Sequence, residues 1–161
     1  MATTVNTKNI KNVCLLGHGG NGKTSLVESM LYLAKETDRL GKISDGNTVS
    51  DYDPEETKRK FSISASVVPV MWKNSKINFL DTPGTLDFAG EVMQSLRVCG
   101  TALIVMDAKS GVDVGSELAW ERATALGVPK AFFINKMDDD NANSAAPSSR
   151  CVRCSGRPSA R

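Results

Sequence analysis

Short apolar runs alternate with amphipathic segments along the first 140 residues of the chain. The apolar runs predict β-strands near residues 11–16, 63–72, 76–80, 101–106 and 130–134. Apolar positions at helical spacing predict helices near residues 23–36, 86–98 and 115–126. This alternation is typical of an α/β domain, in which helices cover a mostly parallel sheet. Because Pro69 has no backbone N–H, we expect the 63–72 strand to lie at an edge of that sheet.

Two segments lack this periodicity. Residues 38–62 are rich in Gly, Asp, Asn and Ser and predict one long loop, which in a compact domain is usually functional or disordered. Residues 141–161 are rich in Ser, Arg and Pro, and Val152 is their only large aliphatic or aromatic residue. Such a segment cannot bury enough apolar surface to order itself, so we expect a disordered tail. We interpret the Cys-x-x-Cys pair within it, Cys151 and Cys154, as coincidental.

Composition and charge narrow the classes of protein that fit this pattern. The 161 residues, 40% of them hydrophobic, suit a single domain with one core. The apolar run 102–106 is too short to cross a membrane, and residues 1–6 lack a signal pattern, so no membrane partner is expected. The cysteines suggest no secreted disulfide framework, which favours the cytoplasm. The net charge of +2 lies beyond residue 138, and the neutral body argues against DNA as a partner.

The most specific motif lies between the first predicted strand and the first predicted helix. It matches G-x-x-x-x-G-K-[ST] and is formed, with the serine that follows it, by Gly17, His18, Gly19, Gly20, Asn21, Gly22, Lys23, Thr24 and Ser25. Small residues let backbone N–H groups turn inward around phosphate oxygens, with the positive end of the helix behind them. Lys23 would lie along the β and γ phosphates, and the Thr24 hydroxyl would hold Mg²⁺. The alternative is a glycine-rich turn without a ligand, and we expect His18 to be a loop residue held by the turn.

A second element, Asp81-Thr-Pro-Gly84, directly follows the apolar stretch 77–80. An aspartate at the carboxyl end of a strand can reach Mg²⁺ through water, and the Gly84 N–H can touch a γ-phosphate. Taken alone, this tetrapeptide is an ordinary turn. Its position after the phosphate-binding motif favours a role in nucleotide binding.

A third element, Asn135-Lys136-Met137-Asp138, follows the last predicted strand. The Asp138 carboxylate can accept hydrogen bonds from N1–H and N2–H₂ of guanine, two donors that adenine lacks. A site built around those donors rejects a base without them. The third element therefore favours GTP and GDP over adenine nucleotides.

Together these elements resemble the translational GTPases, and residues 9–140 are similar to the amino-terminal part of the GTP-binding domain of elongation factor G. The likeness includes the run from Ile77 to Asp138 and the segment from Asp51 to Ile63, which aligns with the first switch of the family. The resemblance implies a three-layer P-loop fold like that of small GTPases, GTP hydrolysis coupled to elongation on the ribosome, and Ser62 as a Mg²⁺ ligand beside Thr24 and Asp81. It also makes residues 38–62 and 84–95 the two switches that order around the γ-phosphate.

Two residues depart from the family pattern at catalytic positions. Thr85 replaces the histidine thought to orient the attacking water, and a hydroxyl is shorter and lacks the charge of an imidazole. Gly20 with Asn21 removes a P-loop carboxylate that the family usually carries. We expect nucleotide binding to survive both changes, whereas fast hydrolysis is in question. A non-hydrolysing GTP-binding module is therefore one alternative function.

The resemblance ends near residue 140. A further strand, a guanine-contacting loop and a final helix are expected after Asp138, and residues 141–161 do not resemble them. We interpret residues 1–140 as a partial, C-terminally truncated GTP-binding domain and the rest as a non-family tail from an altered reading frame or a truncated gene. The strand at 130–134 would then be an unprotected edge, which predicts marginal stability. An inactive fragment is the second alternative.

Overall fold

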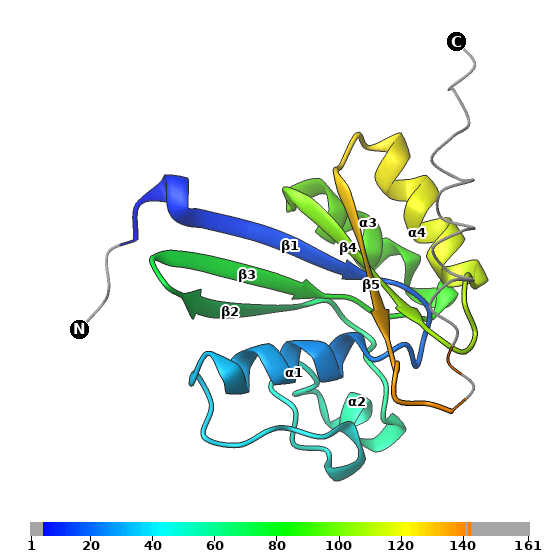
Figure 1. Ribbon diagram of the computed structural model, residues 1–161, viewed down its shortest axis with the longest axis horizontal. Helices are drawn as coiled ribbons and strands as arrows, with labels where there is room; N and C mark the ends of the chain where they lie inside the picture. The colour runs from blue at the N-terminus through cyan, green and yellow to red at the C-terminus, as the bar shows by residue number, and fades with distance from the viewer. Residues whose placement is uncertain (1–4, 141, 143–161) are drawn as a thin grey trace.

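A computed structural model describes residues 5–140 and residue 142 of the chain. The segment expected to be a tail, with Cys151 and Cys154, thus lies almost wholly outside the described residues. Within them the chain forms one sheet with helices on both faces (Figure 1). This arrangement confirms the predicted α/β class and its three layers.

The sheet has five strands: β1 (Ile10–Leu16), β2 (Ser66–Trp72), β3 (Ser75–Asp81), β4 (Thr101–Asp107) and β5 (Lys130–Asn135). Their order is β2-β3-β1-β4-β5. Only the β2–β3 pair is antiparallel, and Pro69 lies opposite Asn78 in it. The mostly parallel sheet is therefore confirmed, and so is the edge position of the strand that carries Pro69.

Two apolar clusters attach the helices to the sheet. Helix α1 (Lys23–Leu33) covers one face, where Val27 and Leu31 pack with Leu15 and Val105. Helices α3 (Ala89–Val98) and α4 (Val114–Ala125) cover the other face, where their residues pack in a second cluster with residues of β1 and β4. The carboxyl ends of β1, β3, β4 and β5 consequently open toward one rim of the sheet, as Figure 1 shows for the strand arrows.

The segment 38–62, which we call the first-switch segment, is not one structureless loop as predicted. It contains a short 3-10 helix, Ile43–Asp45, and helix α2 (Pro54–Arg59). The side chain of Asp53 accepts a hydrogen bond from the Glu55 backbone N–H, Pro54 begins the helix, and Glu56 completes a capping box. These local signals form a helix too short to show an apolar stripe, which explains why periodicity missed it.

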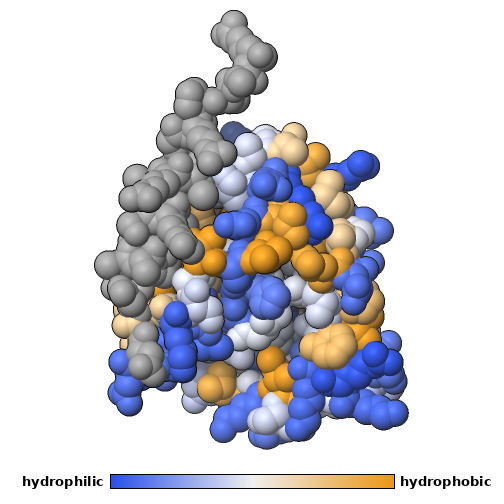
Figure 2. Space-filling view, turned by 90° about the vertical axis from the view of Figure 1, so that its right-hand side faces the viewer, coloured by the Kyte–Doolittle hydropathy of each residue, from blue (hydrophilic) through white to orange (hydrophobic). Residues whose placement is uncertain are grey.

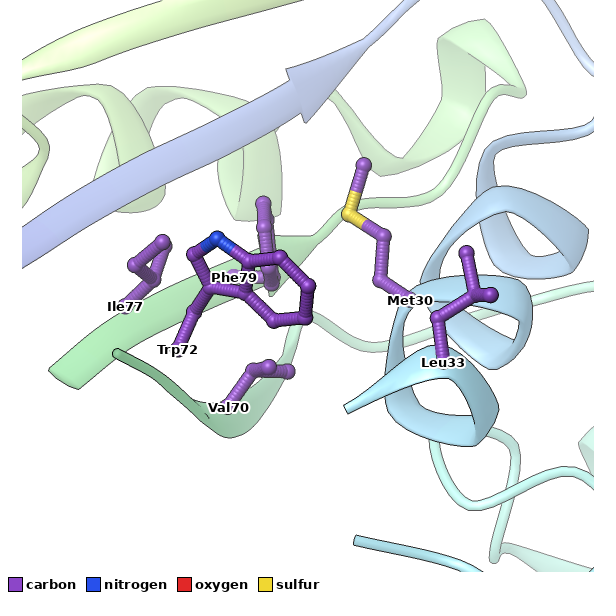
Figure 3. A pocket seen from close by; sticks show the side chains of 6 residues that line it. All are labelled: Met30, Leu33, Val70, Trp72, Ile77 and Phe79. Carbon is purple, nitrogen blue, oxygen red and sulfur yellow. The ribbon is translucent and has the colours of Figure 1, made fainter. Parts of the chain in front are cut away.

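An apolar groove of about 230 Å³ lies on the α1 face, near the amino end of β3. Figure 3 shows its six lining side chains, Met30, Leu33, Val70, Trp72, Ile77 and Phe79. The lining carries almost no hydrogen-bonding atoms, so this groove cannot perform polar chemistry. In the part of the chain that the structure describes, no helix has the length and apolar character needed to span a membrane.

Candidate nucleotide-binding site

A cavity of about 340 Å³ lies at the carboxyl ends of the strands. Four stretches of the chain line it: the loop after β1 with the start of α1, the first-switch segment, the loop after β3, and the end of β5. The lining residues are Gly19, Gly20, Gly22, Lys23, Thr24, Ser25, Ile43, Asp51, Lys60, Phe61, Ser62, Thr82, Gly84, Thr85, Asn135 and Lys136. Figure 2 shows that this side of the molecule is largely polar, with separate apolar patches.

The loop after β1, residues 17–22, is fixed to the neighbouring strands by its backbone and by two asparagines. Gly17 has φ +131°, and a side chain there would collide with the Val105 carbonyl oxygen of β4. The Asn21 side chain donates to that same oxygen at 3.1 Å and to Asp113 at 2.9 Å. In turn, Asn135 of β5 donates to the Asn21 carbonyl oxygen at 2.9 Å. The loop is therefore held in shape by β4, β5 and the start of α4.

Lys23, the first residue of α1, points back across this loop. Its ammonium donates to the carbonyl oxygens of Gly17 and His18, each at 3.0 Å. Burial lowers the pKa of Lys23, while the nearby carboxylates of Asp81 and Asp113 act in the opposite direction. The cation is thus kept at the mouth of the loop, where the charge of a phosphate would compensate for its burial.

Three oxygen-bearing side chains meet beside Lys23. Thr24 donates to Asp81 Oδ2 at 2.7 Å, and its Oγ1 lies 3.4 Å from Ser62 Oγ. Ser62 donates to Asp51 Oδ1 at 2.6 Å. The residues predicted as metal ligands, Thr24, Ser62 and Asp81, are therefore neighbours, although they are far apart in the sequence.

The chemistry of this cluster fits Mg²⁺. Asp81 is 1% exposed, and burial raises its pKa to about 6 against the opposing effects of the Thr24 hydroxyl and Lys23. Its Oδ1 is buried and makes no hydrogen bond within 3.5 Å. A buried carboxylate oxygen and two hydroxyls are hard ligands of the kind that Mg²⁺ prefers. Among the described residues no group of three or more His, Cys, Asp or Glu side chains gathers to hold a metal.

Gly84 and Thr85 close the cavity from the loop after β3. A Cβ at Gly84 would lie 2.5 Å from both the Gly19 nitrogen and Lys23 Nζ, so only glycine fits there. The Thr85 hydroxyl is buried and has no hydrogen-bond partner. Both residues therefore line the cavity beside the loop after β1, and their roles stay predictions.

The third predicted element reaches the cavity only in part. Asn135 and Lys136 line it, whereas Asp138 is exposed and does not. Lys136 has φ +57° and donates to Asp107 Oδ2 at 2.8 Å, a hydrogen bond that lowers the pKa of Asp107. The guanine-recognising role of Asp138 stays a prediction.

The remaining predicted residues hold the loop rather than line the cavity. Gly17, His18 and Asn21 do not contribute to its wall, and Asp81 is reached through Thr24. Sequence reasoning missed Asp51 and Asp107, the acceptors for Ser62 and Lys136. Asp107 ends an apolar strand, as Asp81 does, and that shared position could have revealed it.

Comparison with known proteins places this chain in a family. The model of the elongation factor Tu GTP binding domain matches residues 8–153. An elongation factor G 2 of Streptomyces coelicolor is 45% identical over 129 residues, which cover 80% of this chain and 19% of that protein. A mitochondrial ribosome-releasing factor 2 of Debaryomyces hansenii is 41% identical over 132 residues, covering 82% of this chain and 15% of that protein.

A solved structure shows the same architecture. A crystal structure of a protein from Thermus thermophilus superposes with a TM-score of 0.84 at 34% identity, covering 91% of this chain and 22% of that one. The chain thus spans between about a seventh and a quarter of the length of these relatives. It belongs to the translational GTPases, in the family of the elongation factor Tu GTP binding domain.

Proposed function

We propose that this chain is the nucleotide-binding part of a translation factor that binds GTP and GDP with Mg²⁺ and hydrolyses GTP on the ribosome. The observation that carries the proposal is the convergence of Lys23, Thr24, Ser62 and Gly84 on one cavity. Asp81 stands directly behind Thr24. The names of the relatives, elongation factor G 2 and ribosome-releasing factor 2, support the ribosome as partner.

The phosphate end of the nucleotide would lie on the loop after β1. Its backbone N–H groups and the start of α1 provide hydrogen-bond donors and a positive dipole. Lys23 would exchange its two carbonyl partners for β and γ phosphoryl oxygens and balance the charge that develops there. Thr24, Ser62 and Asp81 would hold Mg²⁺, which neutralises phosphate charge when it is bound.

The base end would lie against the loop after β5. Asn135 is bonded to the loop after β1, and Lys136 to Asp107, so both side chains are held in place. Asp138 would accept the two N–H groups of guanine, which gives the selectivity for GTP over ATP. We expect the factor to act in the cytoplasm, although the ribosome-releasing factor 2 relatives carry the word mitochondrial in their names.

Thr85 favours a second candidate function, a GTP-binding module that does not hydrolyse. Thr85 lines the cavity, and its buried hydroxyl has no hydrogen-bond partner within the described residues. A threonine lacks the reach and charge of the imidazole that the family usually has at this position. Slow hydrolysis with intact binding would follow from that difference.

Titration of the chain with a fluorescent GTP analogue tests the binding proposal. We expect micromolar or tighter binding that requires Mg²⁺ and that Lys23→Met weakens at least about a hundredfold. A chain that binds neither GTP nor GDP would be an inactive fragment, and the proposal would be wrong. Single-turnover phosphate release with and without ribosomes then separates the two functions, because strong stimulation excludes the non-hydrolysing module.

A further inference from the structure

Glu28 is a buried carboxylate that the binding reaction does not itself use. It lies on α1, one turn beyond Thr24, and is 1% exposed. Its Oε1 accepts a hydrogen bond of 2.6 Å from the Val49 backbone N–H, which belongs to the first-switch segment. A buried glutamate needs such partners, because an unpaired carboxylate out of water is costly.

The same side chain meets the first-switch segment at a second place. A Cβ at Gly41 would collide with Glu28 Oε2, so the segment passes directly against the carboxylate there. The Lys42 backbone N–H donates to the Asn47 side chain at 2.7 Å, which fastens the turn between the two points. Glu28 therefore binds the stretch 41–49 at Val49 and packs directly against it at Gly41.

A short series of contacts leads from this anchor to the predicted metal ligands. Two residues after Val49, Asp51 accepts from the Ser62 hydroxyl at 2.6 Å. That hydroxyl lies 3.4 Å from Thr24 Oγ1. The position of Ser62 therefore depends on where Asp51 is held, and Asp51 is held close to Val49.

The far side of Ser62 is fixed separately. Glu56 is 2% exposed, and its Oε1 accepts from the backbone N–H groups of Ile63 at 2.9 Å and Ser64 at 3.0 Å. The Ala65 N–H donates to Glu91 of α3 at 2.8 Å. On the amino side, Glu28 at Val49 and the Ser66 hydroxyl, which donates to the Ser50 carbonyl oxygen at 2.7 Å, hold the segment, whose carboxyl side has anchors of its own.

We propose that Glu28 is a positioning residue that sets the place of the Ser62 hydroxyl and so favours Mg²⁺–GTP over GDP. The inference rests on the proposed function, in which Ser62 is a metal ligand in the GTP-bound form. Removal of the carboxylate leaves the Val49 N–H without its acceptor and loosens residues 41–49, although the Ser50 carbonyl oxygen keeps its hydrogen bond from the Ser66 hydroxyl at 2.7 Å. Asp51 then loses its support on the Val49 side and holds the Ser62 hydroxyl less firmly, whereas the loop after β1 and Lys23, which would hold the β-phosphate, are untouched.

The test compares Glu28→Leu with Glu28→Gln in the full 161-residue chain. Limited trypsin digestion reports the order of the first-switch segment, which contains Arg39, Lys42, Lys58, Arg59 and Lys60. For Glu28→Leu we expect cleavage there to speed up about tenfold and Mg²⁺-dependent GTP affinity to fall about tenfold, with GDP affinity changed less than about twofold. Glu28→Gln keeps an acceptor oxygen for Val49 and should stay within about threefold of the unmodified chain.

Two further variants make the test independent of the folding of Glu28→Leu. Gly41→Ala pushes the segment away from the carboxylate and should change digestion and the GTP-to-GDP affinity ratio in the same direction. Glu36→Leu is the matched control, since Glu36 accepts the Met71 N–H of β2 at 3.0 Å, outside the first-switch segment. It should leave both measurements unchanged.

The results that would overturn the role of Glu28 differ from those that would refute the proposed function. Unchanged digestion and an unchanged affinity ratio in both Glu28→Leu and Gly41→Ala would overturn the inference, and so would equal losses of GTP and GDP. A chain that binds no nucleotide would refute the proposed function and, with it, the nucleotide preference assigned to Glu28. Trypsin digestion would still decide whether Glu28 holds the segment.

Discussion

At the scale of single residues, Asp81 carries a negative charge where burial makes that charge costly. Its pKa is raised by burial from 3.8 to about 6. The folded chain therefore binds the proton more tightly than the unfolded chain between these two values. Stability contributed by the protonated carboxyl is complete below about pH 4 and is lost as the pH rises through 6.

Replacing Asp81 with Asn should remove the loss of stability above pH 6 in metal-free buffer. Below pH 4 we expect the free energy of unfolding of the variant and of the unmodified chain to depend on pH about equally. Above pH 6.5 the variant should have a free energy of unfolding higher by an amount on the order of 2 kcal/mol, relative to the difference at pH 4. Thermal unfolding in EDTA from pH 4 to 7.5 measures it, with the exposed Asp87→Asn as control. Stability curves that run parallel across this range would contradict the assignment.

Asp138 decides the base if the third element works as predicted. Asp138→Asn replaces an acceptor by a donor on one side, which matches the additional oxygen of xanthine better than guanine. We expect GTP affinity to fall at least about tenfold and xanthosine triphosphate affinity to rise. Competition binding measures both. Asp139→Asn is the neighbouring control, and an unchanged GTP preference in Asp138→Asn would remove this residue from the site.

The residues that sequence could and could not identify differ in one respect. Lys23 and Thr24 could be predicted because the spacing that marks them is local to one loop. Ser62 required the family resemblance, because no local pattern marks it. Asp51 was missed because its importance comes from the Ser62 hydroxyl, eleven residues away in sequence, and only folding brings them within 2.6 Å.

At the scale of elements, the loop after β1 depends on the absence of a side chain at Gly17. Gly17→Ala places a methyl group against the rigid Val105 carbonyl of the central sheet, at φ +131°. Gly20→Ala meets no atom within 4 Å, although its φ of +83° is also unfavourable. We expect a cost of more than about 3 kcal/mol for Gly17→Ala and about 1–2 kcal/mol for Gly20→Ala. Chemical denaturation distinguishes them, and equal costs would contradict the contact with β4.

The boundaries of elements were less predictable than their order. Apolar periodicity continued the first helix to residue 36, but the structure ends α1 at Leu33, and Lys35 follows with φ +59°. There Glu36 turns toward β2 and accepts the Met71 N–H at 3.0 Å. The Glu36 backbone N–H also donates to the Leu31 carbonyl oxygen at 3.0 Å, so a local cap and a tertiary contact together replace the last helical turn. The order of strands and helices needed no such contact, because each apolar run is long enough to specify its element.

At the scale of the whole molecule, β5 forms one edge of the sheet within the described residues. Phe132 and Phe133 are 37% and 36% exposed. Phe132 stacks on Trp120 of α4, with ring centroids 5.4 Å apart, and the Lys130 ammonium lies 4.6 Å from the same indole ring. Among the described residues Phe133 has no comparable ring contact, so the two neighbours should respond differently to substitution.

Phe133→Thr should reduce self-association without loss of stability. Phe132→Thr should lower the free energy of unfolding by about 1 kcal/mol or more through its lost stacking on Trp120. Light scattering while the protein is being concentrated measures self-association, and thermal melts measure the change in stability. The reverse pattern would mean that Phe133, and not Phe132, supports the fold. The expected marginal stability stays a prediction for the same melts, and a reversible, cooperative transition well above about 50 °C would contradict it.

The hydrogen bond from Asn135 to the Asn21 carbonyl oxygen joins two sides of the cavity that, under the proposed function, would contact different ends of a nucleotide. Folding, rather than ligand binding, therefore meets the entropic cost of aligning them. A ligand that spans both halves gains a chelate advantage that its separate pieces do not have. Guanosine and pyrophosphate added together should accordingly compete poorly with one intact GDP molecule. Loss of the Asn135–Asn21 hydrogen bond should reduce this difference in binding.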